Sequence, residues 1–221
     1  MKYRPGQETC PLPYSPFKSS TIPRPIGWLS SVSTAGVDNI APYSQWQNIN
    51  FDPPMVMFAA SLYPDGRRKD TVINAESTGW FVWNMATFAL REQVNMSAMA
   101  LPPGESEFAR LAVTREREAL SPAPMVKESP VKFECRYLIT HRLPGRSPLS
   151  MVDIVYATVE MIHIDDKVIM DNGKLDIASI RPIARLGYSD YTVVDTIFEM
   201  RVPESTEVAR HGLEGRAPAE K

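Results

Sequence analysis

Residues 131–140 read VKFECRYLIT, and this stretch indicates the class of fold. Apolar and polar side chains alternate along it. One face would carry Val131, Phe133, Cys135, Tyr137 and Ile139, and the other Lys132, Glu134, Arg136 and Thr140. A period of two residues is typical of a β-strand with one buried face. Such strands are common in antiparallel sheets that pack one face on the core.

Further strands are expected on both sides of this stretch. The segments 25–33, 40–50, 55–61, 79–85 and 151–164 have strand-like composition, and turn sequences such as Asn172-Gly173 separate them. Short helices are expected at 70–77 and 87–100, after the third and fourth strands. Because the strands follow one another in hairpins and no GxGxxG motif occurs, the sequence predicts a mainly β antiparallel barrel with helical insertions.

The composition is that of one globular domain. Of the 221 residues, 43% are hydrophobic and 23% are charged, and the net charge is −2. This balance gives no indication of nucleic-acid binding or of a membrane surface, and no apolar run is long enough to span a membrane. No export signal is visible, so we expect a cytoplasmic protein in which Cys10 and Cys135 are free thiols. No cluster has metal-ligand spacing, so no metal site is expected.

Proline is unusually frequent, at 20 of the 221 residues, and it is spread along the whole chain. Proline is unfavourable inside helices and central strands, so this distribution predicts many short elements joined by stiff loops. We expect a single domain over residues 1–221, with a core at about 20–195, an N-terminal arm at 1–20 and a frayed tail at 204–221.

The segment 67–71 reads RRKDT and joins a buried strand to the expected start of a helix. Three cations there would adjoin the unpaired N–H groups and the positive dipole end of the helix, which attract anions such as a phosphate monoester. Thr71 adds a hydroxyl donor. The alternative is a solvated basic loop in which Asp70 is an ordinary helix cap.

Other polar and aromatic residues admit two interpretations. The segment 39–44 (NIAPYS) could present backbone and hydroxyl groups to a planar heterocycle, or it could be an edge strand interrupted by Pro42. The tryptophans, Trp46 among them, could flank a ring or fill the core. His163 is a candidate for catalysis, although a lone strand histidine more often only packs or hydrogen-bonds. No nucleophile–base pair and no GxSxG motif are present.

Several of these segments occur in an order that is similar to a known family. They are 23–28 (PRPIGW), 39–44 (NIAPYS), 53–54 (PP), 69–71 (KDT), 81–84 (FVWN), 159–164 (VEMIHI) and 185–188 (RLGY). In this order they resemble the flavin reductase-like, FMN-binding split-barrel family, which includes flavoredoxins and the reductase components of two-component monooxygenases. The resemblance covers about residues 20–195. It implies a six-stranded antiparallel Greek-key split barrel that forms a homodimer, with FMN in a groove near the dimer interface.

The resemblance also implies a set of site residues by position. Those that would hold the FMN phosphate are Lys69, Asp70 and Thr71, with help from Arg68. Those that would line the ribityl chain and the isoalloxazine ring are Asn39, Ala41, Ser44, Ser61 and Trp46. Those that would approach from the second subunit are His163, Arg185 and Tyr188. The chain departs from the family pattern at Ser189, where a second glycine is expected.

The activity that the resemblance implies is that of an NAD(P)H:flavin reductase. FMN is the expected cofactor, with FAD as the alternative, and NAD(P)H is the transient electron donor. Because a flavin supplies the hydride chemistry itself, the absence of a catalytic triad does not argue against an enzyme. One alternative is a flavoredoxin-like FMN electron carrier without its own NAD(P)H activity. Another is a non-enzymatic, ligand-binding dimeric barrel. A monooxygenase or another redox protein would be the protein partner.

Overall fold

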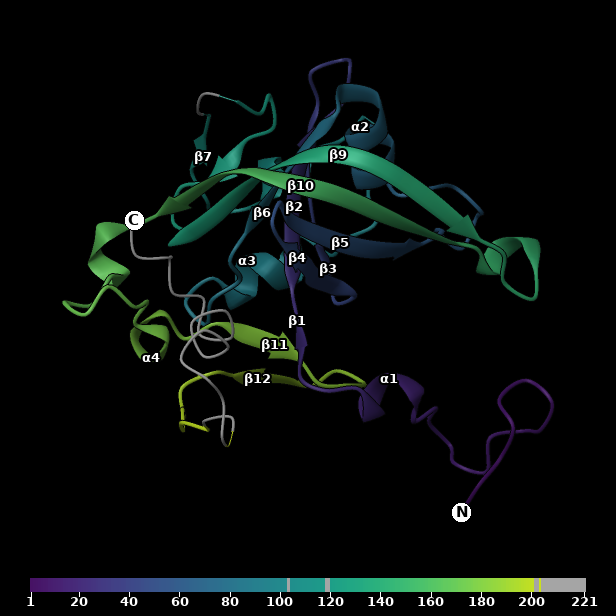
Figure 1. The fold of residues 1–221 in the computed structure, drawn as a ribbon. Coiled ribbons are helices and arrows are strands. Elements are labelled where there is room, and N and C mark those ends of the chain that lie inside the picture. The colour runs from purple at the N-terminus through teal and green to yellow at the C-terminus, as the bar shows by residue number, and fades with distance from the viewer. Residues whose placement is uncertain (103, 118–119, 201–202, 204–221) are drawn as a thin grey trace.

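One strongly curved antiparallel sheet organises the chain (Figure 1). The structure is a computed structural model that describes residues 1–102, 104–117, 120–200 and 203. In order across the sheet, the strands are β3 (Asp38–Tyr43), β2 (Gly27–Val32), β6 (Trp80–Asn84), β9 (Val131–Leu143), β10 (Val152–Ile164), β5 (Pro54–Ser61) and β4 (Trp46–Phe51). Every neighbouring pair is antiparallel, which confirms the predicted class of fold.

The sheet curls into a barrel because its two edge strands are consecutive in the chain. β3 ends at Tyr43 and β4 begins at Trp46, so only Ser44 and Gln45 join the opposite edges of the sheet. The Ala59 N–H donates to the carbonyl of Gln45 at 2.9 Å, so the pairing between β4 and β5 continues up to this link. β3 and β4 therefore act as one bent strand, which reconciles the seven strands of the sheet with the expected six-stranded split barrel.

The inner face of the barrel holds an aromatic core. The rings of Trp46 and Trp83 stack with planes 5° apart and centroids at 5.7 Å. Phe58 contacts both Tyr43 and Phe81. Stacked and edge-on aromatic pairs of this kind add to the free energy that burial of their large apolar surface contributes to folding. Trp46 is thus a core residue.

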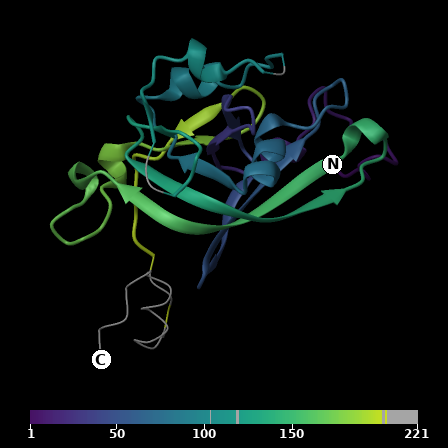
Figure 2. The ribbon, with the colours of Figure 1, turned by 90° about the horizontal axis from the view of Figure 1, so that it is seen from above.

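The predicted apolar face of β9 packs on this core up to the residue where its neighbour β6 ends. Val131 and Cys135 are buried, and Phe133 packs against the same cluster. β6 pairs with β9 only up to Arg136, and beyond that residue β9 pairs with β10 alone. Ile139, expected on the buried face, is 48% exposed because it lies past the end of β6, where the barrel is split. Figure 2 shows the long, curved β9–β10 hairpin.

A second hydrophobic cluster covers the outer side of β2 and β3. It joins Trp28 and Ile40 to residues of α3 (Arg91–Met96) and of the 3₁₀ helix η1 (Glu107–Arg110). Trp28 Nε1 donates to Ser97 Oγ at 2.9 Å, which fixes the end of α3 against the barrel. A separate sheet of β1 (Arg24–Pro25), β11 (Ile183–Arg185) and β12 (Tyr191–Val193) lies below the barrel in Figure 1.

The expected helix at 70–77 forms as α2 (Asp70–Thr78). The expected helix at 87–100 is shorter: Thr87 forms a β-bridge with Pro182, and only Arg91–Met96 are helical, as α3. The remaining elements are α1 (Phe17–Ser20), β7 (Arg115–Glu116), β8 (Met125–Val126), η2 (Pro148–Ser150), η3 (Asp166–Val168) and α4 (Ile177–Ile180). Cys10 and Cys135 are free thiols. The tail predicted to fray, 204–221, lies outside the described residues.

Within the described ranges, no helix has the length and apolar character needed to cross a bilayer.

Gly27 allows β2 to approach β4 closely where the barrel closes. A Cβ atom at Gly27 would lie 3.0 Å from both Cβ and Cε3 of Trp46. We therefore expect Gly27→Val to lower the free energy of unfolding by about 1–3 kcal/mol, because overpacking a filled core forces neighbours out of their rotamers. Urea denaturation followed by tryptophan fluorescence measures this change. An unchanged midpoint would contradict the close packing of these two strands.

Candidate functional site

Buried polar side chains attach the start of α2 to the strands β2 and β3. Thr71 Oγ1 donates to Asn39 Oδ1 at 2.8 Å, and Asn74 Nδ2 donates to Ser31 Oγ at 3.0 Å. All four residues are buried. A buried polar group that loses its hydrogen-bond partner destabilises the folded protein. These bonds therefore fix the position of the start of α2 along β3.

Glu107 of η1 approaches β3 from the other side. Its Oε2 accepts from Asn39 Nδ2 at 2.9 Å and from the Ile40 N–H at 3.2 Å. The side chain is 3% exposed. Burial raises the pKa of the Glu107 carboxyl, and the hydrogen bonds that it accepts only partly offset this effect. Asn39 therefore links Thr71 of α2 to Glu107 of η1 through one amide group.

A small cavity of about 90 Å³ lies beside this link. β3 contributes its floor, and the loop 62–69, the segment 97–99 and Glu107 form its walls; the residues involved are Ala41, Pro42, Tyr43, Tyr63, Lys69, Ser97, Ala98, Met99 and Glu107. Lys69 Nζ lies 3.3 Å from the centre of the Tyr63 ring, a cation–π contact. Burial lowers the pKa of Lys69.

The start of α2 beside Lys69 has free backbone donors. Lys69 is the N-cap residue, and no side chain caps the helix. The first N–H groups of a helix have no partner inside the helix, and this applies to those of Asp70 and Thr71. Together with the Lys69 ammonium they form a set of donors for an anion.

A second cavity, of about 240 Å³, continues along β3 toward the β2–β3 turn. Its lining residues are Ser33, Ala35, Val37, Asn39, Asp70, Asn74, Gly104 and Glu105. We refer to the two cavities together as the β3 groove. Its cation, Lys69, lies in the first cavity together with the carboxylate Glu107, and the carboxylates Asp70 and Glu105 lie in the second. Positive charge is therefore found in the first cavity alone.

The structure brings five of the predicted site residues to the β3 groove. Ala41 and Lys69 line its first cavity, and Asn39 and Asp70 line its second. Thr71 lines neither cavity but donates a hydrogen bond to Asn39. Ser44 is in the β3–β4 link and Ser61 is an exposed residue at the end of β5, and neither lines the groove. Trp46, expected to border a ring, lies instead in the barrel core against Trp83.

Arg68, expected to help with a phosphate, is engaged by two carboxylates. Its Nη1 and Nη2 donate to Glu76 at 2.7 and 2.6 Å, and its Nε donates to Asp153 Oδ2 at 2.8 Å. Arg142 Nε donates to the other oxygen of Asp153 at 2.7 Å. Arg68 thus anchors the loop that carries Lys69 to α2 and to β10, and it lines neither cavity of the groove.

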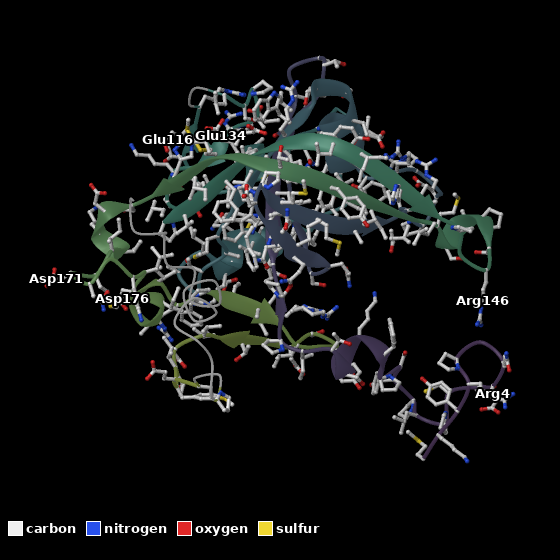
Figure 3. The ribbon with its side chains drawn as sticks, in the orientation of Figure 1. Arg4, Glu116, Glu134, Arg146, Asp171 and Asp176 are labelled. Carbon is white, nitrogen blue, oxygen red and sulfur yellow. The ribbon has the colours of Figure 1, made fainter. Side chains whose placement is uncertain are left out.

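His163 lies outside the β3 groove. Its Nε2 is 2.8 Å from Glu134 Oε1, and Glu134 also accepts from the Ser121 N–H. Glu134 is 1% exposed, and Figure 3 shows it near one end of the β9–β10 hairpin. His163 therefore satisfies a buried carboxylate in the described structure.

Tyr63 and Glu107 are among the groove residues that were not expected from the sequence. Tyr63 follows the buried strand β5 in a loop, and Glu107 begins the one-turn helix η1, 67 residues after Ile40. No local spacing connects Glu107 with Asn39. The YPDG turn that contains Tyr63 is the only local signal that could have pointed to this loop.

The curved sheet with a groove along its bent edge strand defines a split-barrel protein. The model of the flavin reductase like domain matches residues 19–177, and this chain belongs to the flavin reductase-like family. A protein of Aquifex aeolicus is 34% identical over 170 residues, 77% of this chain and 84% of that protein. The protein YwrF of Bacillus subtilis is 29% identical over 191 residues, 86% of this chain and 93% of that protein.

Solved structures agree with the fold. Nitrilotriacetate monooxygenase component B from Bacillus cereus has a TM-score of 0.83 and 28% identity, over 90% of this chain and 98% of that chain. The flavoredoxin of Desulfovibrio vulgaris has a TM-score of 0.70 and 18% identity, over 92% of this chain and 99% of that chain. The second likeness concerns the fold alone.

Proposed function

We propose that this chain binds FMN in the β3 groove and acts as an NAD(P)H:flavin reductase. The observation that carries the proposal is the position of Lys69 and the uncapped start of α2 beside the floor formed by Ala41, Pro42 and Tyr43. A lysine ammonium and the free N–H groups of a helix start both bind phosphate. Membership of the flavin reductase-like family supports a flavin as the molecule that carries this phosphate.

The donors in the groove fit a phosphate monoester joined to a ring system. Lys69 supplies the positive charge, and Asp70 and Thr71 supply backbone N–H groups. Each of the two cavities, of about 90 and 240 Å³, is smaller than the range of about 300–1,000 Å³ that is usual for small-molecule sites, so the proposed flavin would span both. Lys69 is the only cation among their lining residues, which favours FMN over FAD with its second phosphate.

The bound flavin would supply the hydride and electron transfer. The residues of this chain would bind and orient it. Lys69 and the α2 start would hold the phosphate, and Glu107 would keep β3 in place through Asn39 and Ile40. The segment 97–99 covers the first cavity and would exclude water from it. Neither NADH nor NADPH is preferred by this arrangement.

A visible spectrum tests the proposal. We expect the purified protein, with FMN added if necessary, to show flavin absorbance that shifts on binding and that bleaches anaerobically when NADH or NADPH is added. Parallel titration with FAD checks the choice of cofactor. If no flavin binds, the chain would be a non-enzymatic dimeric barrel for another ligand. If flavin binds but only dithionite bleaches it, the chain would be a flavoredoxin-like electron carrier.

We propose further that the protein is a cytoplasmic homodimer that passes electrons to a redox protein. Exposed apolar side chains on the sheet support a second copy of the chain, since Phe51 of the edge strand β4 is 83% exposed and Leu138 of β9 is 46% exposed. The similarity to a component of a two-component monooxygenase supports a monooxygenase as partner.

A further inference from the structure

A cavity of about 310 Å³ lies on the far side of α3 from the β3 groove. Val94 and Asn95 of α3 line it, whereas the residues that follow, 97–99, line the groove. Its other wall is formed by β11 and β12; the full lining is Phe88, Arg91, Glu92, Val94, Asn95, Ile183, Ser189, Tyr191, Thr192 and Val193. Two aromatic and three aliphatic residues make half of this lining apolar, and the other half is polar or charged. Its volume suits a ligand with a single ring rather than a dinucleotide.

Two arginines lie side by side next to this cavity. Arg24 of β1 pairs directly with Arg185 of β11, and Arg185 pairs directly with Tyr191 of β12. Residues directly opposite in an antiparallel sheet point to the same face, and their Cβ atoms are about 4.5–5.5 Å apart. Arg185 Cζ lies 4.5 Å from the centre of the Tyr191 ring, which itself lines the cavity. Neither arginine lines the cavity itself; Arg185 adjoins it through its contact with Tyr191, and Arg24 lies next to Arg185 on the same face of the small sheet.

The positive charge of this pair is not neutralised within the described part of the chain. Arg24 Nη2 donates to the Leu186 carbonyl at 3.2 Å, and Arg185 donates to the Tyr188 carbonyl. Among the described residues, neither arginine forms an ion pair with a carboxylate. Like charges directly opposite each other in a sheet are destabilising. Burial and the charge of Arg185 accordingly lower the pKa of Arg24.

One donor of the pair is also unused. Arg24 Nε is buried and has no hydrogen-bond partner. A buried donor without a partner is uncommon, so the hydrogen bonding of this arginine is incomplete. Pro23 and Pro25 flank Arg24 and restrict its backbone, so its position is fixed before any ligand binds.

The carboxylates near the cavity have other roles. Glu92 pairs with Arg91 at 3.5 Å, and Asp195 lies 3.9 Å from Arg181. Asp190 is exposed and forms no ion pair with either member of the arginine pair. The negative charge that would complement Arg24 and Arg185 must therefore come from outside the described residues.

We propose that this cavity is a second small-molecule site, which binds a single-ring aromatic carboxylate. The ring would lie between Phe88, Tyr191 and the aliphatic lining, where aromatic contacts stabilise it. The carboxylate would meet the guanidinium groups of Arg24 and Arg185, whose planar, forked donors match a carboxylate in two parallel hydrogen bonds. The site is separate from the β3 groove, so the inference does not depend on the proposed flavin chemistry.

Isothermal titration with benzoate and benzamide tests the site, with and without saturating FMN. Both probes have one ring, but only benzoate is charged. We expect benzoate to bind at least tenfold more tightly than benzamide, and Arg185→Gln and Arg24→Gln each to remove most of this difference. Arg146→Gln is the matched control, because Arg146 is exposed at the far tip of the β9–β10 hairpin and bonds only to the Pro5 carbonyl (Figure 3). Ser189→Trp should fill the cavity and abolish binding of both probes without altering the core.

Three results would overturn the proposal. Equal affinities for benzoate and benzamide would show that the arginine pair does not recognise a carboxylate. Retained binding in Ser189→Trp would place the probe elsewhere. Loss of benzoate binding when FMN is added, or in Lys69→Ala, would place it in the β3 groove. Failure of FMN to bind would contradict the proposed flavin activity alone and would leave the benzoate measurements intact.

Discussion

Replacing Lys69 with alanine is expected to raise the dissociation constant for FMN by about 10- to 100-fold. A hydrogen bond to a charged group is typically worth about 1.5–3 kcal/mol, and 1.4 kcal/mol corresponds to a factor of about ten in affinity. Lys69 is the only cation that lines the β3 groove. The N–H groups at the start of α2 would remain in the variant and would account for the residual binding. Titration of FMN followed by quenching of flavin fluorescence measures the change.

Riboflavin and two further variants separate a phosphate contact from a general disturbance. Riboflavin has the same ring but no phosphate, so its affinity should be nearly unchanged by Lys69→Ala. Lys69→Met keeps the length of the side chain over the Tyr63 ring and should lose FMN affinity as Lys69→Ala does. Lys127→Ala removes an exposed lysine outside the groove and should have no effect. An equal loss of riboflavin affinity would mean that Lys69 does not contact the phosphate.

Asp153→Asn is expected to lower the free energy of unfolding at pH 7 by about 2–3 kcal/mol. Asp153 is 2% exposed and accepts hydrogen bonds from both Arg68 and Arg142. Removing one partner of a buried ion pair typically costs about 3–5 kcal/mol, and the lower value applies because the two arginine side chains are 25% and 42% exposed. Urea denaturation measures the difference. The same change at Asp171, an exposed residue of an outer turn in Figure 3, is the control and should be neutral.

The pH dependence of this difference has a definite sign. Burial raises the pKa of Asp153, but the hydrogen bonds and charges of Arg142 and Arg68 outweigh burial and hold the pKa below its usual value. The stability that the ionised carboxylate contributes is therefore present above the unfolded-state pKa of about 3.9 and is lost as the pH falls through the lower folded-state pKa. The wild type should lose its advantage over Asp153→Asn below about pH 4. A difference that does not shrink as the pH falls below about 4 would contradict a stabilising charge on Asp153.

Local sequence patterns predicted the strands and part of the groove. The alternation of residues 131–140 identified β9, and the RRKDT segment identified the start of α2 with Lys69 beside it. Pro42 lies in β3, which is an edge strand of the sheet, so the proline does not interrupt the pairing of a central strand. These features depend on neighbours within a few residues, and local patterns report such neighbours directly.

Local patterns could not assign partners to individual side chains. Arg68 and Lys69 are adjacent cations, yet one bonds to Glu76 and Asp153 and the other faces the groove. From the sequence, Trp46 could belong to a flavin site or to the core. Only its stacking on Trp83 in the structure places it in the core. The Glu107–Asn39 bond joins residues 68 apart in the chain.

The sequence by itself determined a mainly β domain, its strand segments, and an anion-attracting helix start after a buried strand, because each follows from residue type and spacing along a short segment. The expected succession of hairpins is observed only in part, since β5 pairs with β10 and β6 pairs with β2 and β9. The tertiary structure alone decided how the barrel closes and which charges meet. Closure depends on two residues, Ser44 and Gln45, joining opposite edges of the sheet. The unpaired Arg24 and Arg185 come together only because β1 and β11, about 160 residues apart, pair directly in a second sheet.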